Sequence, residues 1–214
     1  MAENNEVPGE LLRRAADGDQ TALADLLTPY RGRLKRMVKI RLNQRLQGRV
    51  DASDIIQDAL LEASQRLREY LDGPGMPFFL WLRHLAGQKL IDVHRRHLGT
   101  LKRDAGLEIS LHHGSWPVAS CASLAEQLLG RLTSPSQAAI KAELRLRVQE
   151  ALNSLDPLDR EVLALRHFEQ LTGAETAQVL GIKPAAAGKR YLRALERLRE
   201  ILAGLPGGLG ELLP

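Results

Sequence analysis

The C-terminal third of the chain carries a pattern that could bind DNA. A short helix predicted from Thr172 is followed by Gly181, which can end that helix in a left-handed conformation, and Pro184 can begin the next one. A short helix, a turn with glycine and a basic second helix form a helix-turn-helix, whose second helix enters the major groove. We predict that the cations of this second helix contact DNA: Lys189, Arg190, Arg193 and Arg197.

Acidic side chains line a second predicted helix, in the N-terminal half. Asp54, Asp58 and Glu62 are four residues apart, so they lie along one helix face. Neighbouring like charges on a helix cost a few tenths of a kcal/mol per pair, and a basic partner surface would relieve that cost. Charge alone also fits a solvated helix face, which needs no partner.

A third helix, predicted over 77–97, places aromatic and basic residues close together. Phe78, Phe79 and Trp81 could stack on the bases of single-stranded DNA, although the same residues would also fit a hydrophobic core. We predict that the polar and cationic members of this helix contact DNA: Arg83, Gln88, Lys89, Arg95 and Arg96.

Other chemistries lack the residues they need. His94, His97 and the pair His112–His113 near Cys121 do not form a ligand set at a known spacing. The single cysteine excludes an internal disulfide, and no glycine-rich phosphate loop or serine nucleophile motif occurs. We therefore predict that the protein is not an enzyme and needs no metal and no cofactor.

The composition favours helices. Leucine, alanine and arginine are abundant, aromatic residues make up 4% of the 214 residues, and 30 basic against 26 acidic residues give a net charge of +4. We predict an all-α protein with two small helical domains joined by a flexible linker. The expected boundaries are a disordered N-terminus (1–9), a first domain (10–98), a linker (99–135), a second domain (136–203) and a tail rich in glycine and proline (204–214).

Two details of the predicted helices can be checked. Pro29 falls inside a helical pattern and is expected to kink or split that helix. Within the linker, Ser123–Leu132 is a candidate short helix. The polar N-terminus is unlike a secretory signal, and no run of about 20 apolar residues occurs, so we expect a cytoplasmic protein without membrane insertion.

Both helical blocks resemble bacterial sigma-70 family sigma factors of the extracytoplasmic-function (ECF) group. Val50–Asp58 is similar to region 2.2, and the segment from Phe79 to Arg96 is similar to regions 2.3 and 2.4. Leu155–Leu163, together with the helix-turn-helix, is similar to region 4.

This resemblance implies a protein that binds core RNA polymerase and directs it to promoter DNA. It implies that Asp54, Gln57 and Asp58 contact the clamp of the β′ subunit, and that the loop 70–77 holds a flipped base of the −10 element. Region 4 would read the −35 element while lying on the β flap. An anti-sigma factor that masks these surfaces is a further partner consistent with the resemblance.

The chain departs from the family pattern at two places. Gln88 stands where the family usually has asparagine, and the recognition helix begins Ala185-Ala186-Ala187-Gly188 where Thr-Val-Lys or Thr-Val-Arg is common. Gly188 weakens a helix by up to about 1 kcal/mol relative to alanine. Gly188 also lacks a side chain that could contact DNA. We therefore expect base reading at −35 to depend on Lys189, Arg190 and Arg193.

Two other functions stay open from the residues alone. A transcriptional regulator could carry the same helix-turn-helix with a different N-terminal sensor domain and would not bind the polymerase clamp. A helical protein-interaction adaptor would bind no nucleic acid at all, and charge reversal at Arg190 and Arg193 would leave it working.

Overall fold

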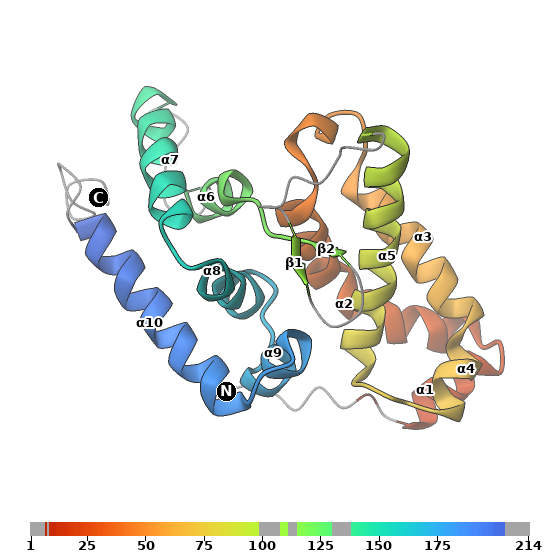
Figure 1. Ribbon diagram of the computed structural model, residues 1–214. Helices are drawn as coiled ribbons and strands as arrows, with labels where there is room; N and C mark the ends of the chain where they lie inside the picture. Colours follow the sequence, from red (N-terminus) through yellow and green to blue (C-terminus); the bar gives the residue numbers. More distant parts are fainter. Residues whose placement is uncertain (1–6, 8, 99–107, 111–114, 130–137, 204–214) are drawn as a thin grey trace. The chain divides into compact units, whose positions relative to one another are not determined.

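The computed structural model describes residues 7, 9–98, 108–110, 115–129 and 138–203. The chain divides into two compact units, Met1–Glu108 and Ile109–Pro214. Helices form the body of both units, which confirms the all-α prediction, and Figure 1 shows their order along the chain. No helix among the described residues is long and apolar enough to cross a membrane.

The described residues of the N-terminal unit form five α-helices. They are α1 (Gly9–Ala16), α2 (Gln20–Arg41), α3 (Ala52–Gln65), α4 (Leu67–Asp72) and α5 (Phe78–Leu98), with a single 3-10 turn at Gln44–Leu46. Helices α2, α3 and α5 pack against one another, and α1 packs on α2 and α4. Their shared core consists of aliphatic side chains that are almost fully buried, among them Leu34, Met37, Ile55, Ile56, Leu82, Leu85 and Leu90.

Local capping explains where these helices begin. The Asp19 carboxylate accepts hydrogen bonds from the backbone N–H groups of Thr21 and Ala22, and Asp51 accepts one from Ser53. Hydrogen bonds from Ala22 and Arg14 lower the pKa of Asp19. Pro29 does not split α2, which runs unbroken from Gln20 to Arg41, because its missing N–H falls on an exposed side of the helix.

The C-terminal unit is also helical. Its helices are α6 (Cys121–Leu129), α7 (Ala138–Asn153), α8 (Pro157–Leu163), α9 (Gly173–Leu180) and α10 (Pro184–Ala203), and a π-helical turn (Ala164–Phe168) extends α8. Helix α10 packs along α7, α8 and α9 (Figure 1). Before α6, two strands of three residues each, β1 (Glu108–Ser110) and β2 (Ser115–Pro117), pair with each other.

Part of the segment predicted as a linker is folded. Helix α6 packs against α7, and Leu124, Ala125 and Leu129 on α6 are buried, as is Val118 before it. The prediction of a short helix in this segment is confirmed with shifted ends, Cys121–Leu129 instead of Ser123–Leu132. The predicted disordered residues 1–6 and 8 and the tail 204–214 lie outside the described residues.

Candidate polymerase and nucleic-acid interfaces

Helix α3 presents an exposed acidic face. Its buried stripe, which includes Ile55, Ile56 and Ala59, packs on α2 and α5, so Asp54, Gln57 and Asp58 point to solvent. None of these three side chains has a hydrogen bond or ion pair with another described residue. The three predicted polymerase-contacting residues therefore share one surface and are available to a partner.

Leu61 continues this surface and was missed by the sequence analysis. It follows Gln57 and Asp58 at helical spacing and has 58% of its surface exposed, although most leucines of this unit are buried. The signal was present in the sequence, because Leu61 falls outside the buried stripe. We call Asp54, Gln57, Asp58 and Leu61 the α3 face.

Glu62 behaves differently from the other acids of α3. Its carboxylate pairs with Lys89 Nζ on α5 at 2.6 Å and with Arg66 Nη1 at 2.9 Å. Hydrogen bonds from Lys89 and Arg66 lower the pKa of Glu62. Glu62 follows Asp54 and Asp58 at the predicted helical spacing, but its carboxylate is bound by Lys89 and Arg66 and is therefore not free for a partner as the other two are.

The predicted DNA-contacting residues of α5 fall into two groups. Gln88, Arg95 and Arg96 are exposed, as a DNA-binding role requires. Arg83 is only 4% exposed, because nearly the whole first half of α5 is enclosed by its unit, so its side chain is not accessible to DNA in this conformation. Lys89 is half-buried and already paired with Glu62.

An aromatic cluster closes the start of α5. The rings of Tyr70 and Trp81 stack with centroids 4.8 Å apart, and Phe78 lies 5.4 Å from Tyr70 and 5.7 Å from Trp81. The Tyr70 hydroxyl donates a hydrogen bond to the Met76 carbonyl at 3.0 Å, and burial raises the pKa of Tyr70. The aromatic residues thus serve as core here. They lie at both ends of the loop 73–77, which is the part of the predicted segment 70–77 that is outside α4 and α5.

The helix-turn-helix forms as predicted, with one addition. Thr172 caps α9 in a reciprocal capping box with Glu175, a partner that the sequence analysis did not identify. Gly181 ends α9 in the left-handed region at φ 63°, where glycine is favoured, and Pro184 begins α10. The turn therefore sets the direction of the recognition helix α10 relative to α9.

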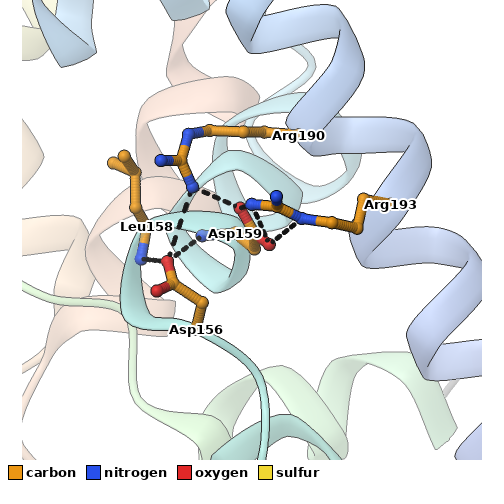
Figure 2. A network of polar contacts seen from close by, with 5 residues as sticks. All are labelled: Asp156, Leu158, Asp159, Arg190 and Arg193. Carbon is orange, nitrogen blue, oxygen red and sulfur yellow. Dashed lines mark hydrogen bonds and ion pairs between the residues drawn. The ribbon is translucent and has the colours of Figure 1, made fainter.

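Two of the four predicted −35 contacts are tied to another helix. The Asp159 carboxylate on α8 accepts hydrogen bonds from Arg193 Nε and Nη2, both at 2.8 Å, and from Arg190 Nη1 at 2.7 Å. Figure 2 shows both guanidinium groups reaching from α10 to the first turn of α8, where Asp156 caps the helix. Arg190 Nη1 also lies 3.6 Å from Asp156 Oδ1.

The charge of this network is balanced. Burial acts to raise the pKa of Asp159, but hydrogen bonds from Arg193 and Arg190 outweigh it, so the pKa of Asp159 is lowered. The other two predicted contacts differ: Lys189 is exposed without a partner among the described residues, and Arg197 pairs with Glu200 at 3.3 Å. The described residues contain no cluster of metal-ligating side chains.

Comparison with known families places both units. The Sigma-70 region 2 family matches residues 26–99, which span most of α2 and all of α3–α5. The Sigma-70 region 4 family matches residues 145–198, which include the helix-turn-helix. The ECF RNA polymerase sigma factor ShbA of Streptomyces griseus is 32% identical over 199 residues, which cover 91% of this chain and 95% of ShbA. The chain belongs to the ECF sigma factor family.

As an ECF sigma factor, the chain binds RNA polymerase and recognises promoters, and it is not an enzyme. The match to region 2 excludes the alternative of a regulator with an unrelated N-terminal sensor domain. The match to region 4 excludes the alternative of an adaptor that binds no DNA.

Other relatives agree. The ECF sigma factor SigD of Mycobacterium tuberculosis is 28% identical over 190 residues, covering 89% of this chain and 81% of SigD. The solved structure of CnrH in complex with the cytosolic domain of CnrY has a TM-score of 0.54 and 23% identity. It covers 92% of this chain and 97% of that chain, which supports the fold.

Proposed function

We propose that the α3 face binds the clamp of the β′ subunit. The observation that carries this proposal is the difference between the acids of α3. Glu62 is used inside the unit, whereas Asp54 and Asp58 are exposed without an internal partner. Leu61 lies among them, so a basic partner helix would gain both charge complementarity and buried apolar area.

In this proposal the exposed end of α5 and the segment 70–77 bind the −10 element. Gln88, Arg95 and Arg96 are the residues that can reach DNA, and the stacked Tyr70 and Trp81 hold the loop in place. Arg83 is buried, so it supports α5 from within the unit rather than contacting DNA.

In this proposal the C-terminal unit binds the −35 element through α10 and contacts the β flap of the polymerase. Lys189 and Arg197 are exposed cations of that helix, and Arg190 and Arg193 complete the set. We further propose a first domain over 10–98, a connection from residue 99, and a second domain that includes α6 as well as 136–203, because α6 packs on α7. An anti-sigma factor that covers the α3 face would keep the protein inactive in the cytoplasm.

In vitro transcription tests the proposal. The full chain is combined with bacterial core RNA polymerase and a library of genomic promoter fragments, and RNA 5′ ends are sequenced. We expect discrete start sites preceded by shared −35 and −10 elements. The variant Asp54→Arg, Asp58→Arg should lose these start sites because it repels a basic clamp surface.

The matched control is Glu10→Arg, Asp25→Arg, which makes the same change in charge at exposed positions of α1 and α2. The control should keep the start sites. Equal losses in the two variants would contradict the assignment of the clamp contact to α3.

A further inference from the structure

The Asp159 carboxylate sits between the two helices that the C-terminal unit must hold in register. It is the third residue after the Asp156 cap, and its side chain is 7% exposed. Arg190 and Arg193 approach it from α10, three residues apart and therefore on one helix face. The carboxylate is thus fully engaged with α10 and is shielded from solvent.

The two arginines keep other donors free. A guanidinium carries five N–H groups in a planar fork. Arg193 uses Nε and one side of Nη2 for Asp159, which leaves Nη1 without a partner among the described residues, and its side chain is 61% exposed. Toward the residues that the structure describes, Arg190 uses only Nη1, and its side chain is 32% exposed. One edge of each guanidinium is therefore bound to Asp159, and the N–H groups of another edge remain available to a further acceptor.

We propose that Asp159 is a positioning residue for DNA binding: it fixes Arg190 and Arg193 so that their remaining N–H groups meet DNA phosphates. This inference rests on the proposed role of α10 at the −35 element. An arginine that is already held in place loses less side-chain freedom when it binds, so affinity rises without a further contact. Phosphate contacts of this kind set the register of a recognition helix on the duplex.

The opposite role for Asp159 gives the opposite prediction. If the carboxylate merely competed with phosphate for the two arginines, removing its charge would strengthen DNA binding. Burial of Asp159 argues against competition, because a phosphate can approach the open edges of the guanidiniums without displacing a shielded carboxylate.

The test measures binding of the full chain to a fluorescent duplex of mixed sequence and about two helical turns, over a series of salt concentrations. Asp159→Asn should weaken binding about tenfold, although it removes a negative charge. The matched control is Glu143→Gln, which removes the same charge from an exposed carboxylate–arginine pair on α7. The control should bind as tightly as the wild type or slightly more tightly.

A double-mutant cycle separates positioning from general damage to the unit. Arg190→Ala, Arg193→Ala should lower the salt slope by about two, the value expected for two lost phosphate contacts. Adding Asp159→Asn to that variant should then cause no further loss. The proposal would be overturned if Asp159→Asn bound DNA as tightly as Glu143→Gln. It would also be overturned if Asp159→Asn lowered the DNA affinity of the double alanine variant as much as that of the wild type.

Two further outcomes are decisive. If thermal unfolding shows that Asp159→Asn does not fold, Arg193→Lys replaces it, because lysine keeps the charge but cannot form the two-pronged bond to Asp159. Unchanged affinity in Arg193→Lys would overturn the proposal. An unchanged salt slope in the double alanine variant, with wild-type start sites still mapped by transcription, would refute the role of Asp159 while leaving the promoter function standing.

Discussion

Helices α3 and α10 both carry a charged face, but they use it in opposite ways. The acids Asp54 and Asp58 on α3 have no partner among the described residues, whereas Arg190 and Arg193 on α10 are bound to a carboxylate from another helix. The carboxylates of α3 can bind a partner because they are not paired within the described part of the unit. The guanidiniums of α10 can bind a partner because Asp159 already holds them in position. A charged stripe in a sequence therefore does not reveal whether its side chains are paired.

The difference also concerns what each helix gains from a partner. Like charges at helical spacing on α3 repel one another, and a basic surface removes that repulsion. On α10 the charges are already compensated, so DNA adds contacts to a network that is stable by itself. Substitutions should therefore separate protein binding from DNA binding according to the helix they affect.

The largest expected effect is on polymerase binding. Asp58→Arg should weaken the affinity for core RNA polymerase about 100-fold, because it places a cation against a basic partner. Arg193→Ala should leave that affinity unchanged, since Arg193 lies on α10, the helix that we propose binds DNA, and not on the α3 face. Titration of labelled core enzyme with each variant measures this, and an equal loss in both would remove the contrast between the two helices.

The next effect concerns the exposed leucine of the α3 face. Leu61→Ala should weaken core binding by about 1–2 kcal/mol, which is the transfer free energy of the lost apolar surface. The free energy of unfolding should hardly change because the side chain is already 58% exposed. Leu61→Met keeps the apolar surface and should bind normally. Should Leu61→Ala bind as well as wild type, Leu61 would lie outside the interface.

The recognition helix allows a smaller gain in stability. Gly188 lies within α10 and a Cβ built there meets nothing within 4 Å, so Gly188→Ala adds helix propensity without a clash. We expect the C-terminal unit to be stabilised by up to about 1 kcal/mol. Urea unfolding followed by circular dichroism measures the change. A loss of stability would mean that the glycine serves a conformational purpose that packing does not explain.

The smallest effect is on pH dependence, and it distinguishes the two units. His94 Nε2 accepts a hydrogen bond from the Asn43 N–H at 3.2 Å, and burial lowers the pKa of His94. The unfolded chain therefore binds this proton more readily, so the N-terminal unit loses stability as pH falls below about 6.5, the ordinary histidine value.

The C-terminal unit should respond only in stronger acid. The lowered pKa of Asp159 stabilises the folded unit above the ordinary carboxyl range, and this contribution is lost only as pH falls below about 4. Urea unfolding at neutral pH and at about pH 5.5 measures the earlier loss. His94→Gln should reduce the difference in the free energy of unfolding between the two pH values. If that difference is unaltered, the loss of stability comes from groups other than His94.

Local signals in the sequence were sufficient wherever neighbours along the chain decide the structure. The caps at Asp19, Asp51 and Asp156, the left-handed turn at Gly181 and the buried stripe of α3 all follow from residues a few positions apart. The α3 face was predictable for the same reason, because exposure on a helix follows from periodicity.

The errors arose where distant residues meet. Lys89 and Glu62 pair between α5 and α3, and Asp159 meets Arg190 and Arg193 across more than 30 positions of sequence. The burial of Arg83 likewise depends on which elements enclose α5. Periodicity cannot identify such partners, since it describes one helix at a time.

The Asp159 network also bears on how fast α10 can find DNA. Two carboxylates and two guanidiniums meet there, and their formal charges cancel (Figure 2). Long-range attraction to a polyanion depends on net charge, so this part of α10 contributes little to the rate of diffusional encounter. Its arginines act only at close range, after other cations or the bound polymerase have brought the helix to the duplex. The approach of α10 to the duplex and the contact of its arginines with DNA are thus separate steps in time.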